Sequence, residues 1–127
     1  MTAAEYKRSI CRHLMHAYML KEEQIDIYLP RFLDSLQTYL EKLQQPLQTG
    51  NFRELRKAAH TLKGALLNLG LQELADIAYT MEKAAGTEDT TQNFQAMYRQ
   101  LHNEISSFTG ADPANPAADT ASPNRHP

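Results

Sequence analysis

The stretch HTLKGALLNLGL, residues 60–71, carries apolar residues at spacings of three and four, which is the period of an amphipathic helix. Gly64 stands in the middle of this helix, and His60 stands one turn before it. A glycine lowers the stability of a helix interior by about 1 kcal/mol relative to alanine. The stretch therefore raises the question of what the chain gains from a missing side chain next to a histidine.

The ends of this helix are marked by residues with a known preference for helix ends. Asn51 and Glu54 have the spacing of a capping box, and Gly50 is free to adopt a positive φ just before them. Gly70 has the position of a C-terminal glycine cap. The sequence therefore predicts a helix from Phe52 to about Leu69.

The same period covers nearly all of the remaining chain, and no useful length of it alternates with period two. Further helices are expected over about residues 3–18, 21–47, 71–86 and 94–108. Long amphipathic helices joined by short loops favour an all-α fold, an antiparallel up-and-down four-helix bundle with an additional N-terminal helix.

Two local features indicate where one of these helices should end or kink and where the last one should begin. Pro30 should end a short helix at about Leu29 or kink a longer one, because proline lacks the backbone N–H and disfavours helical geometry in the preceding residue. Asp89 with Gln92 has the spacing of an N-terminal cap for the last helix.

The apolar pattern stops after Phe108. The segment 109–127 has four of the six prolines and no aromatic or large aliphatic residue, so it is expected to be a disordered tail rich in proline and alanine. The expected organisation is an N-terminal helix packed on the bundle over residues 1–20, the four-helix bundle over residues 21–108, and the tail.

Composition excludes several classes of protein. The chain of 127 residues is 42% apolar and 22% charged, as in an ordinary globular domain, and it has neither a membrane-span pattern nor the apolar core of a signal peptide. Cys11 is its single cysteine, so no internal disulfide is expected, in agreement with a cytoplasmic location. A formal charge of −2 and a pI near 6.2 argue against a coat for nucleic acid, and no contact with a membrane is expected.

Positive charge is nevertheless concentrated around His60. Between residues 53 and 63 the only anion is Glu54, whereas the cations are Arg53, Arg56, Lys57 and Lys63. An anionic group or an acidic partner is favoured on this part of the chain.

Residue spacing places His60 on the solvent side of its helix. With 100° per residue, one face carries Leu55, Ala58, Ala59, Leu62, Ala65, Leu66 and Leu69, and the opposite face carries Arg53, Arg56, Lys57, His60, Lys63, Gly64 and Leu67. Helical side chains lean toward the N-terminus, so Lys63 should reach back over His60, and Gly64 leaves the imidazole open to another protein.

An exposed imidazole has chemistry that suits this position. With an unperturbed pKa of about 6.5, a free imidazole is largely neutral in the cytosol and has a ring nitrogen available for nucleophilic attack. A phosphoryl group on that nitrogen would carry nearly two negative charges, which Lys63 and the neighbouring arginines would stabilise.

Plainer interpretations of the same residues stay open at this point. His60 can be an ordinary solvated side chain, and a helical glycine often serves close packing. Cys11, His13 and His16 lie on one short helix but have no second cluster of ligands, so no metal site is predicted.

The stretch AHTLKGALLNLGL, residues 59–71, resembles the signature of the histidine phosphotransfer (HPt) domain of two-component phosphorelays. The signature has a histidine, a leucine, Lys-Gly and a second glycine six residues after the first, and its matching residues are His60, Leu62, Lys63, Gly64, Asn68, Leu69 and Gly70. The helices on either side, with RFLDSLQTYLEKL and LADIAYTMEKAA, extend the resemblance over about residues 22–108.

The resemblance implies a four-helix bundle whose exposed histidine takes a phosphoryl group from a receiver-domain aspartate and passes it to another receiver. It implies that His60 is the phosphorylated nucleophile, that Lys63 with Arg56 stabilises the phosphoryl group, and that Gly64 gives the receiver steric access. The partners are then response-regulator receivers and a hybrid sensor histidine kinase. Mg²⁺ would belong to the receiver, so the chain needs no cofactor of its own.

The residues after Gly64 depart from the family pattern. The two positions after Gly64 are commonly small or polar in the family, whereas here Ala65 is followed by the bulky Leu66 and Leu67. Leu66 is expected in the core, and Leu67 on the solvent face. We expect Leu67 to form an apolar docking patch for a receiver helix, with Arg53 and Lys57 as the charged part of the same docking surface.

Two other functional classes are a helical adaptor and an enzyme, and a His60 substitution tests the first of them. A helical adaptor that docks receiver or kinase domains without being phosphorylated would keep its function. An enzyme with its own active site is disfavoured, because the sequence has no glycine-rich ATP loop, carboxylate pair or nucleophile triad. The expected protein is a stand-alone, monomeric phosphoryl carrier without kinase activity of its own.

Overall fold

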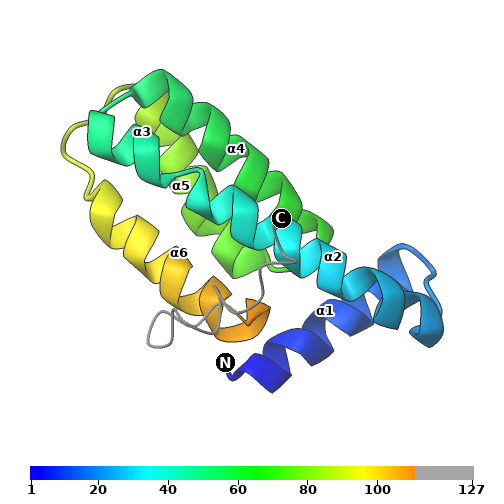
Figure 1. Ribbon diagram of the computed structural model, residues 1–127. Helices are drawn as coiled ribbons and strands as arrows, with labels where there is room; N and C mark the ends of the chain where they lie inside the picture. Colours follow the sequence, from blue (N-terminus) through cyan, green and yellow to red (C-terminus); the bar gives the residue numbers. More distant parts are fainter. Residues whose placement is uncertain (111–127) are drawn as a thin grey trace.

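A computed structural model describes residues 1–110, and these fold into six α-helices without a strand (Figure 1). The helices are α1 (Ala3–Ala17), α2 (Glu22–Glu41), α3 (Gln44–Thr49), α4 (Phe52–Asn68), α5 (Gln72–Gly86) and α6 (Phe94–Thr109). The all-α prediction is confirmed. The predicted tail lies, from residue 111 onward, outside the described residues.

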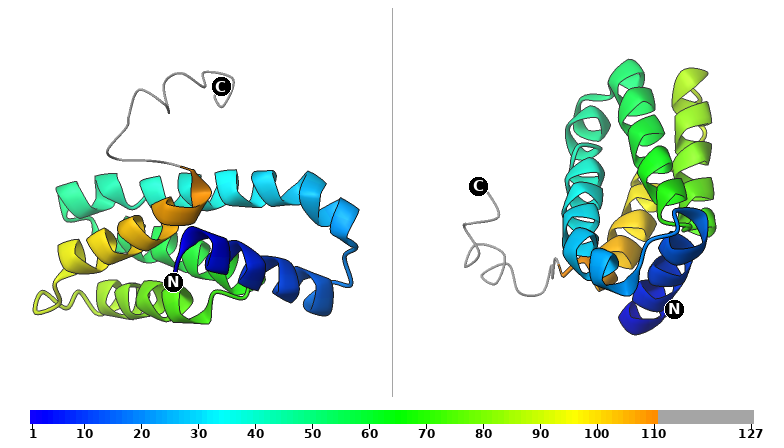
Figure 2. Two further views of the ribbon diagram at one scale, coloured as in Figure 1. Left: turned by 90° about the horizontal axis from the view of Figure 1, so that it is seen from below. Right: turned by 90° about the vertical axis from the view of Figure 1, so that its right-hand side faces the viewer.

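Four helical rods form the bundle. α2 packs against α4, α4 against α5, α5 against α6 and α6 against α2, which closes a ring of neighbours. Successive rods run in alternate directions, and α1 lies across α2 and α6 at one end (Figures 1 and 2). The predicted up-and-down bundle with an additional N-terminal helix is confirmed.

The core consists of the apolar stripes that the spacing predicts. Its fully buried large side chains come from every helix except α3, with one more from the α2–α3 joint: Phe108, Ile10, Leu14, Ile25, Leu36, Leu40, Leu43, Leu62, Leu66, Met81, Leu101 and Ile105. Burying each such side chain contributes about 1.5–3 kcal/mol, so these stripes hold α4 and α5 in fixed register.

The first of the two alternatives predicted for Pro30, a short helix that ends at about Leu29, is wrong. α2 continues through Pro30, which is exposed, so water can reach the carbonyl of Asp26 that loses its helical donor. The chain instead breaks at Lys42–Leu43, because Pro46 has no N–H for the carbonyl of Lys42. The break leaves Leu43 fully buried and starts the short helix α3.

The predicted ends of α4 are present in the structure. The Asn51 side chain accepts a hydrogen bond from the backbone N–H of Glu54 at 3.1 Å, and Gly50 has a φ of +68°. The reciprocal half of the capping box is missing, because the Glu54 carboxylate lies 3.5 Å from Lys57 Nζ instead.

Gly70 ends α4 in a Schellman motif. Its N–H donates to the carbonyl of Leu67, the N–H of Leu71 donates to the carbonyl of Leu66, and Gly70 itself has a φ of +76°. This tight turn joins α4 directly to α5.

The predicted cap of the last helix is wrong. Asn93, and not Asp89, caps α6 by accepting a hydrogen bond from the N–H of Ala96 at 2.9 Å. Asp89 accepts from the backbone N–H and hydroxyl of Thr91 within the preceding loop. Its short side chain satisfies a turn where the spacing suggested a helix start.

α1 covers the end of the bundle where α4 meets α5. The Tyr6 ring packs on Phe108 and its hydroxyl donates to Glu104 of α6. The His13 ring lies directly over Gly70, where a Cβ atom would come within 2.5 Å of its Cγ. Close packing of α1 is therefore a second reason, besides the positive φ, for a glycine at residue 70.

Candidate functional site

His60 projects from the exposed side of α4. Its side chain is 66% exposed, whereas its neighbours Ala59 and Leu62 are fully buried. The apolar residues of α4 face the bundle, and this orientation turns the imidazole outward, as the spacing predicts.

Gly64 has open space next to it. A Cβ atom built there meets no atom within 4 Å, and its backbone is not in the left-handed region. Neither close packing nor an unusual φ therefore requires a glycine at this position. What its missing side chain provides is free space on the face of α4 that carries His60, one turn away.

Glu82 of α5 joins His60 and Lys63 of α4 into one cluster. Its Oε2 lies 2.9 Å from His60 Nδ1, and its Oε1 lies 2.9 Å from Lys63 Nζ. The Lys63 contact is an ion pair without the alignment of a hydrogen bond. One carboxylate thus holds both the imidazole and the ammonium group.

The Glu82 contact selects one tautomer of His60. An ionised carboxylate can only accept, so Nδ1 must carry the proton and donate it to Glu82. In the neutral ring Nε2 then has no proton and keeps its lone pair. The nitrogen farther from Glu82 is therefore the one prepared for nucleophilic attack.

Glu82 is ionised because of its two partners. Burial acts to raise the pKa of its carboxyl, but Lys63 and His60 outweigh burial and lower the pKa below the ordinary value of 4.5. The side chains of Lys63 and Glu82 are 20% and 16% exposed, so water screens this pair less than a surface pair.

An aromatic ring completes the cluster on α5. Lys63 Nζ lies 4.7 Å from the centroid of the Tyr79 ring, and Lys83 Nζ lies 4.5 Å from the same centroid. Both distances are typical of cation–π contacts. Tyr79 thereby contacts two ammonium groups, of which Lys63 also pairs with the carboxylate that contacts His60.

The other predicted site residues divide between two edges of α4. Arg56 lies on the α5 side, where its Cδ would be 3.1 Å from a Cβ at Gly86. Lys57 lies on the opposite edge, and Arg53 and Leu67 are exposed, Leu67 to 41%. The structure thus brings His60 and Lys63 together through Glu82 and places Lys57 apart from them.

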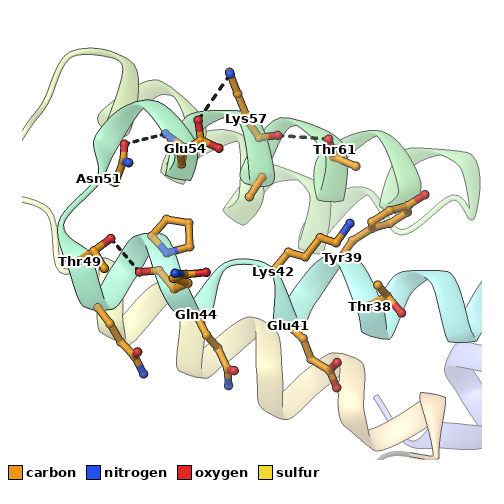
Figure 3. A pocket seen from close by; sticks show the side chains of 14 residues that line it. Thr38, Tyr39, Glu41, Lys42, Gln44, Thr49, Asn51, Glu54, Lys57 and Thr61 are labelled. Carbon is orange, nitrogen blue, oxygen red and sulfur yellow. Dashed lines mark hydrogen bonds and ion pairs between the residues drawn. The ribbon is translucent and has the colours of Figure 1, made fainter. Parts of the chain in front are cut away.

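Lys57 lines a polar groove of about 1180 Å³ between α4 and the α2–α3 segment. Figure 3 shows Lys57 and Thr61 on the α4 side of this groove, with Tyr39, Lys42 and Gln44 on the other side. His60 does not line the groove, so the groove and the histidine cluster are separate features of α4.

Within residues 1–110 no group of three or more potential ligands is arranged to hold a metal ion. Three residues of α1 were candidate metal ligands, namely Cys11, His13 and His16. Of these, His13 packs on Gly70 instead. No helix in the described part of the chain is long and apolar enough to cross a membrane.

A comparison with protein-family models matches residues 28–109 to the Hpt domain. The match covers α4, α5, α6 and most of α2, and it includes the His60 cluster. The chain belongs to the Hpt domain family. Searches of curated proteins and of solved structures gave no match.

Membership in the Hpt family identifies the coarse function. Hpt domains are phosphocarrier modules of two-component systems, and they interact with receiver domains and kinases. The signature resemblance seen in the sequence is thereby confirmed.

The sequence pattern does not single out Glu82 or Tyr79. Both lie on the flank of the α5 stripe and have no local motif. A signal was present in the turn: an antiparallel hairpin centred near Gly70 places residues around 80–82 opposite His60.

Proposed function

We propose that His60 is the phosphoryl-carrying residue of this Hpt domain. Its Nε2 attacks the phosphorus of a receiver aspartyl phosphate, the P–O bond breaks, and the aspartate leaves with the electron pair as a carboxylate. The imidazole keeps its Nδ1 proton, so the phosphorylated ring is an imidazolium. In onward transfer the next aspartate attacks the phosphorus, and the imidazole leaves as a neutral group.

The contact between His60 Nδ1 and Glu82 at 2.9 Å is the observation that carries this proposal. A carboxylate at that nitrogen raises the electron density of the ring and stabilises the positive charge that phosphorylation creates. The same contact directs the reactive Nε2 away from Glu82, toward a partner.

The neighbouring residues have supporting roles in the proposal. Lys63 and Arg56 stabilise the phosphoryl oxygens, and Gly64 leaves room for the receiver. Leu67, Arg53 and Lys57 form the docking surface. Mg²⁺ and the groups that activate the aspartate come from the receiver, and the protein is a cytoplasmic carrier without kinase activity of its own.

Transfer from a ³²P-labelled receiver to the protein and to its His60→Gln variant tests the proposal. The expected label on the normal protein is acid-labile and base-stable, as for a phosphohistidine, and the variant takes none. His16→Gln is a matched control, since His16 is an exposed histidine of α1 outside the cluster. Equal binding of receivers to both proteins with no label on either would instead establish the non-phosphorylated adaptor.

A further inference from the structure

Some charged side chains around His60 have a partner of opposite charge, and others do not. Glu82 is paired with Lys63, and Glu54 is paired with Lys57. Lys83, which is exposed on α5, has no acidic group within 4 Å in the part of the chain that the structure describes. Its ammonium group is thus a positive charge that no side chain there compensates.

Tyr79 fixes the position of this ammonium group. Lys83 follows Tyr79 by four residues, so its side chain leans back along α5 and places Nζ 4.5 Å from the ring centroid. The same ring contacts Lys63 at 4.7 Å, and two like charges gathered at one ring repel each other. The negative face of the aromatic ring offsets part of that repulsion, and an arriving anion would offset the rest.

With Lys63 as its only cation, the cluster around a phosphorylated His60 would carry a net negative charge. The phosphoryl group carries nearly two negative charges and Glu82 carries one. The protonated imidazole and Lys63 supply two positive charges in return. Arg56 can balance this charge from α4, and Lys83, which contacts the same Tyr79 ring as Lys63, can add a further positive charge from α5.

We propose that Lys83, positioned by the Tyr79 ring, is the second ammonium group that stabilises a phosphoryl group on His60. The proposal rests on the proposed function, because it takes His60 as the phosphorylated residue. Lys63 keeps its contact with Glu82, and Lys83 extends from beside the Tyr79 ring toward the phosphoryl oxygens. The phosphoryl-binding cations then come from both α4 and α5.

Phosphoramidate tests this without a partner protein. Attack of His60 Nε2 on its phosphorus breaks the P–N bond of the reagent and releases ammonia. ³¹P NMR then follows the second ionisation of the phosphoryl group, whose midpoint is near pH 6. The charged or titratable groups facing it are Lys63 and Arg56 from α4 and Tyr79, Glu82 and Lys83 from α5.

Lys83→Gln should raise this midpoint by roughly half a pH unit, because a nearby cation favours the dianion. Tyr79→Leu should shift it in the same direction, whereas Tyr79→Phe, which keeps the ring, should leave it unchanged. Lys42→Gln removes a lysine from the groove between α4 and the α2–α3 segment, which His60 does not line, and serves as the matched control. Circular dichroism verifies that each variant is folded.

The outcomes separate this proposal from the relay. An unchanged midpoint in folded Lys83→Gln overturns the role of Lys83 and leaves His60 as the carrier. A shifted midpoint, together with a failure of every receiver to label His60, supports the cation site and overturns the relay. If neither phosphoramidate nor any receiver labels His60 in the folded protein, both are overturned.

Discussion

His60 Nδ1 and Glu82 Oε2 lie 2.9 Å apart although 22 residues separate them in the sequence. The contact joins α4 to α5 across their exposed edge and fixes which ring nitrogen is free. Because Glu82 also pairs with Lys63, one carboxylate holds both the imidazole and an ammonium group.

Replacing Glu82 with Ala should slow phosphorylation of His60 by about tenfold, which corresponds to about 1.4 kcal/mol of lost transition-state stabilisation. Glu82→Gln should lose less, since its amide oxygen still accepts the Nδ1 proton. Single-turnover transfer from a phosphorylated receiver measures both rates. Asp76→Ala, at another exposed position of α5, should transfer normally, and equal rates for all variants would contradict the orienting role.

Glu82 should also make stability depend on pH. Its pKa is lowered in the folded protein, so its contribution is complete above the ordinary value of 4.5 and is lost as the pH falls through the lowered folded value. Urea unfolding should show the normal protein more stable than Glu82→Gln near neutral pH, and this gap should close in acid. A gap that stays constant between about pH 6 and 3 would speak against an ionised Glu82.

Replacing Gly64 with Ala should stabilise the fold and impair phosphoryl transfer. The added Cβ meets open space, so unfolding should require about 1 kcal/mol more free energy, whereas transfer from a receiver should slow. Gly70→Ala is the contrasting variant. Its φ of +76° and the His13 ring at 2.5 Å should make it destabilising by at least about 1–3 kcal/mol in thermal unfolding. A Gly64→Ala protein that transfers at the normal rate would remove steric access as the role of this glycine.

Leu67→Asp should weaken receiver docking without unfolding the bundle. Leu67 is 41% exposed, and the loss of its apolar contact together with the added negative charge should reduce affinity by roughly tenfold. Titration calorimetry with a receiver measures the affinity, and thermal unfolding should be nearly unchanged. Unaltered affinity would place the docking surface elsewhere on α4.

The helices and the exposure of His60 could be predicted because both depend on local periodicity. Leu62 and Leu66 define the buried face of α4, and that face determines where His60 points. The capping roles of Asn51 and Gly70 could also be predicted from the sequence, because each residue acts on its immediate neighbours.

The remaining features depend on contacts between distant residues. Glu82 and Tyr79 acquire their roles only when α5 packs antiparallel to α4, and nothing in their own neighbourhood marks them. The break before α3 could not be predicted from the prolines alone. Pro30 and Pro46 both remove a helical N–H, yet α2 continues through Pro30 and ends before Pro46.

The length of the tight turn at Gly70 also determines which residues of α4 and α5 meet at the site. α5 begins two residues after it, so the count of residues in the turn determines which α5 side chain arrives beside His60. One inserted residue would rotate α5 by about 100° relative to α4, unless its core contacts slipped to compensate. A loop far from the histidine, with no reactive group of its own, thus decides whether a carboxylate meets the imidazole.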